Sequence, residues 1–243
     1  MTTEVALSQG ARMLTGAGIV ELATYGAANC ETDGDVAVYQ VVAHGLDHLG
    51  RLIVACDLQS TTGSPEGAVR LSISTVAPEF CVNIVAANLE AVGQLQWEDT
   101  MGSLRYGVIH LTRVFMHGAG NPIGFDYDEM LASALNLPEI DTDALRARDV
   151  VGRLTQRQLR QLADGVRAKE ILGVAMTSRA EVCAHRHRKT VFIADISEIG
   201  LLLMELRTGF MQLTLVRFPQ RVRTFAQLDD AVRDLGVLAS VRN

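Results

Sequence analysis

Residues 69–76 read Val-Arg-Leu-Ser-Ile-Ser-Thr-Val, in which apolar and polar side chains alternate strictly from Val69 to Ser74. Successive side chains of a β-strand point to opposite faces, so this pattern is typical of a strand with one face on a core and the other in water. Further strand-like segments, separated by turn-forming residues, occupy positions 19–25, 36–42, 51–56, 89–97 and 104–115. Several short strands joined by turns predict a closed or nearly closed β-barrel in this half of the chain.

Helices are predicted on either side of these strands. Residues 4–14 read as a short first helix. Asp126 with Glu129, and Thr155 with Gln158, have the spacing of a capping box, in which two side chains bond the free backbone N–H groups of a helix start. We therefore expect two further helices, beginning at Asp126 and at Thr155.

The C-terminal part shows the clearest local unit of the sequence. Residues 201–206 and 210–218 are strand-like and are joined by the two-residue turn Thr208-Gly209. A helix is predicted from Thr224, with a glutamine three residues later to complete its capping box, and Gly236 is expected to end it. This pattern predicts a β-hairpin followed by a helix.

Two loops suggest how the chain is divided. Gly118 to Gly124 ends the barrel strands, and residues 137–142 follow the first middle helix. We therefore expect an α+β fold with three parts. These are a barrel domain at 1–124, a helical connector at 125–152 and a smaller α+β module at 153–243.

Composition limits the class of protein. The 243 residues are 48% hydrophobic, which is enough for a core and too much for a disordered chain. No apolar run approaches the roughly 20 residues that cross a bilayer, and the longest, at 199–206, has the length of a buried strand. The N-terminus has no secretory signal pattern, and the four cysteines are scattered. We expect a cytoplasmic protein with reduced thiols and no membrane partner.

Charge is unevenly distributed along the chain. Residues 1–145 contain 18 acidic and 5 basic side chains, whereas residues 146–189 contain 4 acidic and 11 basic ones. We interpret the basic segment as a solvated, arginine-rich helix, and the alternative is a surface that attracts phosphate or carboxylate groups. Nucleic acid is not the expected partner, because Phe192 is the only stacking aromatic near this segment.

Histidines are the natural places to look for a site. His44 and His48 would share one face of a helix and could hold a metal there, but Gly45 and the flanking strands favour a turn instead. We therefore predict two loop histidines and no metal site. His110 and His117 are interpreted as surface or rim residues.

A denser group of candidate ligands lies further along the chain. Cys183, His185 and His187 would share one face of a strand at intervals of about 6–7 Å, too far apart for three ligands on one ion. Any one of them could bind haem iron axially, while Arg186 and Arg188 could pair with ligand carboxylates. The alternative is an exposed basic strand end. Nucleophile, phosphate-loop and dinucleotide motifs are absent from the sequence, so no catalytic residue is predicted.

The C-terminal hairpin resembles a known domain. The run from Glu198 through Val216-Arg217-Phe218-Pro219 and the helix at 224–235 is similar to the domain called DUF2470. That domain commonly follows a pyridoxamine-phosphate-oxidase-like split barrel, which the strand pattern of residues 18–115 and the passage 71–78 also resemble. Nearly the whole chain is therefore similar to the haem-utilisation (HugZ-type) group.

The resemblance implies a mostly antiparallel split barrel that forms a homodimer with a small, cofactor-like ligand at the dimer cleft. Relatives bind haem or flavin mononucleotide (FMN), and some cleave haem oxidatively. This chain departs from the family pattern in two places, because residues 152–158 and 240–243 lack the histidines found there in relatives. The barrel half also offers few bases for a flavin phosphate: Arg12, Arg51, Arg70, Arg105 and Arg113.

Three functions follow from the resemblance and its departures. The first is binding of haem or a related tetrapyrrole, with oxidative haem cleavage as an extension. The second is a non-catalytic dimeric binding or regulatory protein, in which the site has decayed and the fold persists. The third, less favoured because of the scarcity of bases, is an FMN-dependent oxidoreductase.

Overall fold

The computed structural model describes residues 2–24, 37–61, 66–76, 85–118, 120–179 and 190–241. The chain divides into two compact units. Residues 2–76 and 85–136 belong to the first, and the chain from Leu137 onward forms the second. The helical stretch 125–152 is shared between them, because α2 (Tyr127–Ala134) belongs to the first unit and α3 (Ala144–Val151) to the second.

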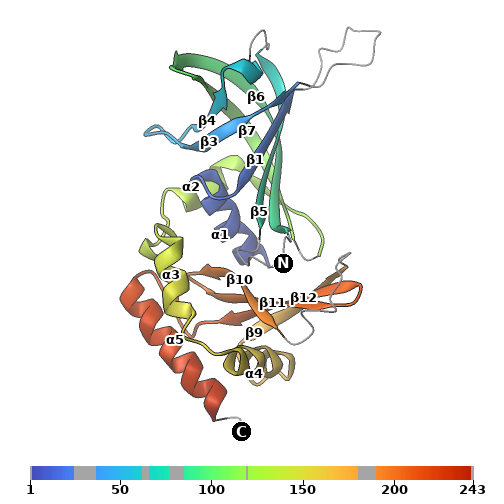
Figure 1. Ribbon diagram of the computed structural model, residues 1–243, viewed down its shortest axis with the longest axis vertical. Coiled ribbons are helices and arrows are strands. Elements are labelled where there is room, and N and C mark those ends of the chain that lie inside the picture. Colours follow the sequence, from blue (N-terminus) through green and yellow to red (C-terminus); the bar gives the residue numbers. More distant parts are fainter. Residues whose placement is uncertain are drawn as a thin grey trace. The chain divides into compact units, whose positions relative to one another are not determined.

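The first unit is built on one antiparallel sheet, which has eight strands within the described ranges (Figure 1). Their order is β2-β1-β5-β6-β7-β4-β3, and β8 also pairs with β7. The bounds are β1 (Ile19–Thr24), β2 (Val38–Tyr39), β3 (Val41–Leu46), β4 (Leu52–Asp57), β5 (Gly67–Val76), β6 (Val85–Met101), β7 (Leu104–His117) and β8 (Ile123–Asp126). Strands β1 and β3 approach each other without pairing, so the sheet curls into a half-barrel. The predicted α+β split barrel is confirmed.

Residues 69–76, whose side chains alternate between apolar and polar, form part of strand β5 as predicted. In β5, Val69, Leu71 and Ile73 are buried inside the curled sheet, while Arg70 is exposed on its outer face. Helix α1 (Thr3–Leu14) contacts β3, β5, β6, β7 and β8 and closes the core. A Cβ atom on Gly10 would lie 2.5 Å from the Met130 side chain, so glycine allows α1 to pack closely on α2.

The single strand predicted at 36–42 is wrong, because the described part of that segment contains two strands. Strand β2 pairs with β1 and β3 pairs with β4, at opposite ends of the strand order. The break falls at Gln40, whose backbone N–H donates to the Ser60 hydroxyl oxygen at 3.2 Å. The N–H of Gln40 thus bonds a side chain and not a neighbouring strand, while its carbonyl oxygen accepts from the Asp57 N–H at 2.9 Å.

The capping box predicted at Asp126 is also wrong. Asp126 is the N-cap of α2, but its side chain makes no capping hydrogen bond. The residue is also the last of β8, where it pairs with Arg113 of β7. The strand pairing therefore sets its backbone, and the helix begins without the side-chain cap.

The second unit places helices on a four-stranded antiparallel sheet of order β10-β11-β12-β9. The strands are β9 (Gly173–Arg179), β10 (Val191–Ser197), β11 (Gly200–Arg207) and β12 (Phe210–Arg217). With α3 come α4 (Gln156–Arg167) and α5 (Phe225–Ser240), and two short 3-10 turns, η1 (Gln59–Thr61) and η2 (Glu139–Asp141), complete the elements described in the two units. The predicted hairpin is confirmed, with Gly209 in the left-handed conformation (φ +79°) that the turn requires.

Helix starts in this unit follow the sequence closely, whereas one helix end does not. The capping boxes at Thr155 and Thr224 both form. The expected stop at Gly236 is wrong, because α5 continues to Ser240. Gly236 serves packing instead: a Cβ there would lie 3.3 Å from Nε2 of Gln158, which donates to the Gly236 carbonyl oxygen at 3.2 Å.

Strand β11 is buried from Gly200 to Leu206, as expected from the apolar run at 199–206. Within the part of the chain that the structure describes, no helix combines the length and the apolar character of a membrane span.

Candidate functional site

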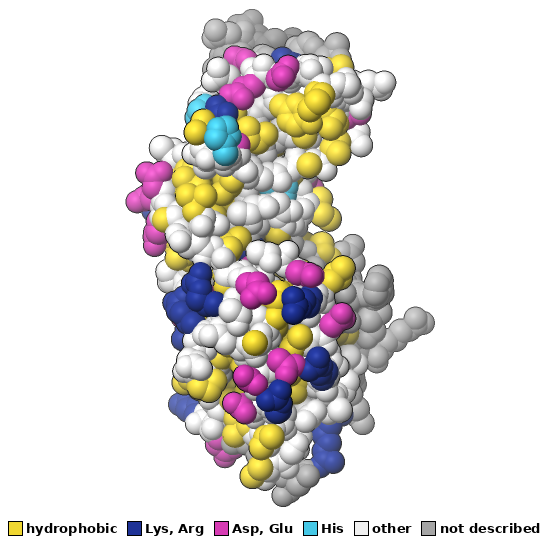
Figure 2. Space-filling view, turned by 90° about the vertical axis from the view of Figure 1, so that its left-hand side faces the viewer, with side chains coloured by type: hydrophobic (Ala, Val, Ile, Leu, Met, Phe, Trp, Pro, Cys, Tyr) yellow, Lys and Arg dark blue, Asp and Glu magenta, His cyan; other side chains and the backbone are white. Residues whose placement is uncertain are grey.

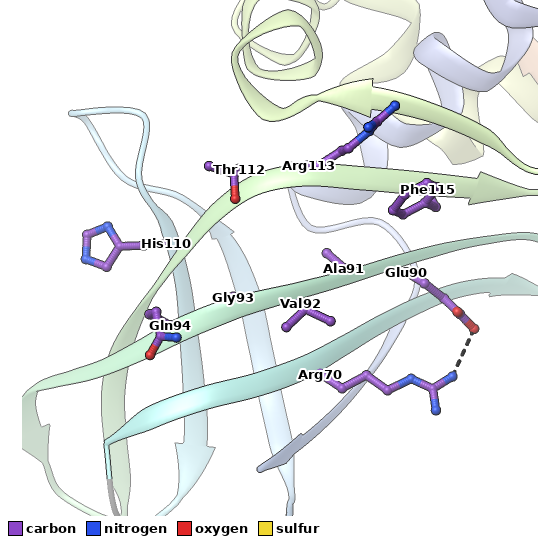
Figure 3. Close-up of a pocket in the computed structure, with 10 residues that line it drawn as sticks. All are labelled: Arg70, Glu90, Ala91, Val92, Gly93, Gln94, His110, Thr112, Arg113 and Phe115. Carbon is purple, nitrogen blue, oxygen red and sulfur yellow. Dashed lines mark hydrogen bonds and ion pairs between the residues drawn. The ribbon is translucent and has the colours of Figure 1, made fainter. Parts of the chain in front are cut away.

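An open hollow of about 610 Å³ lies on the outer face of the curled sheet, across β5, β6 and β7 (Figure 3). Ten residues line it: Arg70, Glu90, Ala91, Val92, Gly93, Gln94, His110, Thr112, Arg113 and Phe115. Its volume is within the range of 300–1,000 Å³ that is typical of small-molecule sites.

The alternation of β6 explains why polar groups gather here. Leu89, Ala91 and Leu95 point into the core and are buried. Their neighbours Glu90 and Gln94 therefore point outward, into the hollow. The hollow is thus built from the side chains that the barrel core does not use.

A β-bulge shapes the centre of the hollow. Ala91 pairs with Val114 and Gly93 pairs with Leu111, so Val92 alone faces two residues of β7, Thr112 and Arg113. In a regular strand neighbouring side chains point to opposite faces, but the extra residue leaves both of these exposed. Val92 is itself 57% exposed and gives the hollow an apolar floor.

On one side of the hollow the charged side chains interact with one another. The guanidinium of Arg70 lies 3.2 Å from the Glu90 carboxylate, and Nε2 of His117 lies 3.6 Å from the same group. The Asn88 side-chain amide donates to Glu90 at 3.1 Å. Arg70 is therefore neutralised by a carboxylate that is itself held in place.

The other side holds an arginine in a different setting. The Arg113 guanidinium lies 5.5 Å from the centre of the Phe115 ring, a cation–π contact. Both side chains lie over Gly124 of β8, where a Cβ atom would come within 3.1 Å of Phe115 and 3.3 Å of Arg113. Among the described residues, Arg113 makes no ion pair with a carboxylate.

His110 stands at the end of the hollow away from Phe115. It is exposed on β7 opposite Gln94, three residues before Arg113 (Figure 3). The arrangement thus combines an imidazole, an apolar floor, an aromatic ring and one guanidinium without a carboxylate partner. It can bind a flat ligand that carries an acidic group.

The sequence-predicted ligands Cys183, His185, His187, Arg186 and Arg188 lie outside the described residues. Of the five barrel arginines, Arg70 and Arg113 reach the hollow. Arg51 instead pairs with Asp47 at 2.7 Å and Glu98 at 2.6 Å, and Arg105 stacks 4.4 Å from the Trp97 ring centre. Arg12 bonds the Ser8 carbonyl oxygen within its own helix.

The pair His44 and His48 is arranged differently from the prediction of two loop histidines. His48 is exposed in the turn, but His44 lies within β3, and its Nε2 is 2.7 Å from the Met13 carbonyl oxygen. Burial lowers the pKa of His44, against the opposing effect of the Met13 and Ala17 carbonyls. The described ranges contain no cluster of three or more metal-ligating side chains.

Sequence reasoning treated His110 as an ordinary surface residue and did not single out Phe115. Strict alternation would place His110 and Phe115 on opposite faces of β7, because they are five residues apart. Both face outward only because of the bulge at Thr112 and Arg113, and their association with Arg70 depends on strand pairing that the sequence does not display. No local motif would have found this group.

The second unit has a hollow of about 550 Å³ between α4 and α5. Here Asp229 pairs with Arg153 and, at 2.6 Å, with Arg233, which also contacts Asp230 at 2.8 Å. Figure 2 shows positive and negative side chains interspersed over the face that carries α5. The charges that line this hollow are therefore paired with one another.

No protein-family model matches the sequence, and no curated protein matches it. Among solved structures, a haem-binding protein from Mycobacterium smegmatis is similar in fold over 97% of this chain and 98% of that chain, with a TM-score of 0.50 and 16% identity. A protein of unknown function from Agrobacterium tumefaciens matches 97% of each chain at a TM-score of 0.35 and 14% identity.

A third solved structure is a pyridoxinephosphate oxidase-family protein from Clostridium acetobutylicum. It covers 53% of this chain and 99% of that chain, at a TM-score of 0.34 and 12% identity. At these identities each likeness concerns the fold alone. Of the three, the haem-binding protein has the highest TM-score. That match extends over both units of the chain.

Proposed function

We propose that this chain is a small-molecule binding protein whose ligand is haem or a related tetrapyrrole, held in the hollow on β5, β6 and β7. The proposal depends on one observation, the grouping of His110, Phe115 and Arg113 around the exposed Val92. The whole-chain likeness in fold to a protein described as haem-binding supports it.

The residues of the hollow suit the parts of a haem molecule. His110 could ligate the iron through a neutral imidazole nitrogen. Val92 and Phe115 would contact the macrocycle, and Arg113 would bind a propionate through charge-assisted hydrogen bonds. Bound haem would supply a redox-active iron centre.

FMN fits this hollow less well. Its phosphate carries up to two negative charges and is usually held by several donors. Only Arg113 offers an unneutralised cation here, because Arg70 is paired with Glu90. A ligand with separate carboxylates, each with one negative charge, matches a single unpaired arginine better than a phosphate does.

A haem titration followed by absorption spectroscopy tests the proposal. The wild-type chain is expected to shift the main haem band at close to one equivalent, and His110→Ala is expected to remove that shift. His48→Ala, which alters an exposed turn histidine, is the matched control. If wild-type protein leaves the haem spectrum unchanged, the proposal is wrong.

A second proposal places the iron ligand in the segment that contains Cys183, His185 and His187, with Arg186 and Arg188 as partners for carboxylates. This idea derives from the sequence. The separate variants Cys183→Ala, His185→Ala and His187→Ala distinguish it from ligation by His110. Loss of the haem shift in one of these, with His110→Ala unchanged, would assign the ligand there.

Whether the chain also cleaves haem is a separate question. Incubating the haem complex with a reductant and oxygen would bleach the haem band and give an open-chain product if the chain is an oxygenase. A stable band under those conditions would favour the binding or regulatory function. We propose that the chain binds haem without cleaving it, because the histidines that relatives have at the corresponding helix start are missing from residues 152–158.

We also propose that the C-terminal unit is a DUF2470-like domain and that the chain is a cytoplasmic homodimer. The hairpin end Arg217-Phe218-Pro219 supports the first idea, with Phe218 buried in the core of its unit. Exposed Ile19, Val92 and Phe115 on the outer face of the sheet support the second. A monomeric mass in light scattering would contradict the dimer.

A further inference from the structure

We propose that Arg113, and not Arg70, binds the acidic group of the ligand in this hollow. The ligand class is then a flat, largely apolar molecule with a carboxylate near one end. This inference rests on the proposed function, since it concerns the same hollow, but it can fail separately.

The guanidinium groups of Arg70 and Arg113 have different interaction partners. Arg70 faces the Glu90 carboxylate at 3.2 Å, and that carboxylate also accepts a hydrogen bond from Asn88. Two serine hydroxyls, on Ser72 and Ser74, hold the Asn88 oxygen at 3.0 and 3.1 Å. A ligand that recruited Arg70 would have to displace a carboxylate that this network keeps in place.

Arg113 is not held in such an ion pair. Its guanidinium contacts the Phe115 ring and makes no ion pair among the described residues, although Asp126 lies opposite it on β8. A ring attracts a guanidinium more weakly than an anion does. The planar guanidinium can therefore bond an incoming carboxylate with two parallel N–H groups while Phe115 supports its other face.

The backbone fixes the direction in which Arg113 reaches. The bulge opposite Val92 exposes this residue together with Thr112, and in Figure 3 its side chain extends from β7 toward β8. Gly124 leaves room there, since a Cβ atom would press on both Arg113 and Phe115. Gly124 is thus a positioning residue for the anion-binding group.

The spacing along β7 gives the ligand a length. His110 and Arg113 are three residues apart, which at the rise of a strand separates their backbones by about 10 Å. A ligand that contacts both side chains would have to extend along β7 from one to the other.

The test compares protoporphyrin IX, which has free carboxylates and no iron, with its dimethyl ester, using absorption and fluorescence titrations of the full chain. The wild type is expected to prefer the acid. Arg113→Gln should weaken acid binding by about tenfold, as for the loss of a charge-assisted hydrogen bond, and abolish the preference. Arg70→Gln is the matched control on the neighbouring face and should change the acid affinity by less than about threefold.

Gly124→Ala provides a second variant that keeps the charge of Arg113. It should lower the preference for the acid over the ester while leaving ester binding nearly unchanged, a split that general unfolding would not produce. Arg113→Lys should recover part of the preference, because it retains the charge and loses the planar pair of donors.

Each outcome decides the inference. If Arg70→Gln weakens acid binding as much as Arg113→Gln, or if the wild type binds the ester as tightly as the acid, the assignment to Arg113 is overturned while porphyrin binding stands. If the wild type binds neither porphyrin, the inference and the proposed function both fall. If the acid binds through Arg113 but haem shows no iron ligation, only iron ligation is lost.

Discussion

Two hollows of similar volume, about 610 and 550 Å³, differ in how their arginines are used. In the groove between α4 and α5, both Arg153 and Arg233 contact the Asp229 carboxylate. On the curled sheet, Arg70 is paired but Arg113 faces an aromatic ring. Volume therefore does not separate the two hollows, whereas the pairing of their arginines does.

A glycine lines each hollow, Gly93 on the curled sheet and Gly236 in the groove, and substituting Gly93 has the largest expected effect. A Cβ at Gly93 would lie 2.6 Å from Cδ2 of Leu111 and 2.7 Å from the His110 carbonyl oxygen. Because one of these atoms belongs to the backbone, Gly93→Ala is expected to lower the free energy of unfolding by about 1–3 kcal/mol. Urea denaturation measures it, and an unchanged midpoint would show that the bulge region yields easily.

Removing the carboxylate partner of Arg70 should leave both arginines of the barrel hollow without an ion pair to Glu90 or any other described carboxylate. In Glu90→Gln the guanidinium of Arg70 is released, so affinity for protoporphyrin IX should rise by about three- to tenfold. The same titration checks it, with Glu98→Gln as a control for loss of a carboxylate elsewhere on β6. A decrease in affinity would mean that Glu90 contributes to binding rather than blocking it.

The stability of the first unit should depend on pH through His44, which lies in β3. Burial lowers the pKa of His44 from its ordinary value of 6.5, so the unfolded chain takes up a proton there before the folded chain does. Stability is expected to fall as the pH drops below about 6.5 and to stop falling below the folded pKa.

Thermal unfolding of the wild type and His44→Gln at several pH values isolates this contribution. Glutamine keeps an N–H group for the Met13 carbonyl but does not titrate. The variant should lose less stability than the wild type between neutral and mildly acidic pH. Parallel curves for the two proteins would contradict the assignment.

Asp229→Asn should give the groove between α4 and α5 an arginine without a carboxylate partner, as in the barrel hollow. This change leaves Arg153 without its carboxylate and Arg233 with only Asp230. Weak binding of protoporphyrin IX at a second site is then expected, with only a small change in stability because the pairs lie near the surface. A stoichiometry that stays at one porphyrin per chain would show that a free arginine is not sufficient.

Gly236→Ala should have the smallest effect and is the counterpart of Gly93→Ala. Alanine favours a helix interior over glycine by about 0.8–1 kcal/mol, and the new Cβ would meet only the flexible Gln158 side chain at 3.3 Å and Leu154 at 3.6 Å. We expect a slight gain in the urea midpoint. A loss comparable to that of Gly93→Ala would show that α4 and α5 cannot separate at all.

Local chemistry made several elements predictable. The capping boxes at Thr155 and Thr224 and the hairpin turn at Gly209 depend on residues within four positions of one another, so their contacts can be read along the chain. The end of α5 was not predictable in this way. Gly236 is used there for packing against Gln158, which lies in another helix.

The alternation at residues 69–76 determined by itself that Arg70 would face away from the core, since strand side chains alternate. Only the tertiary structure decided what Arg70 would meet. The pairings of Arg70 with Val92, and of Val92 with Thr112 and Arg113, join three segments of the chain, and shifting any strand by one residue would turn its side chains to the opposite face. The hollow thus depends on register and on one bulge, which are set when distant strands pair.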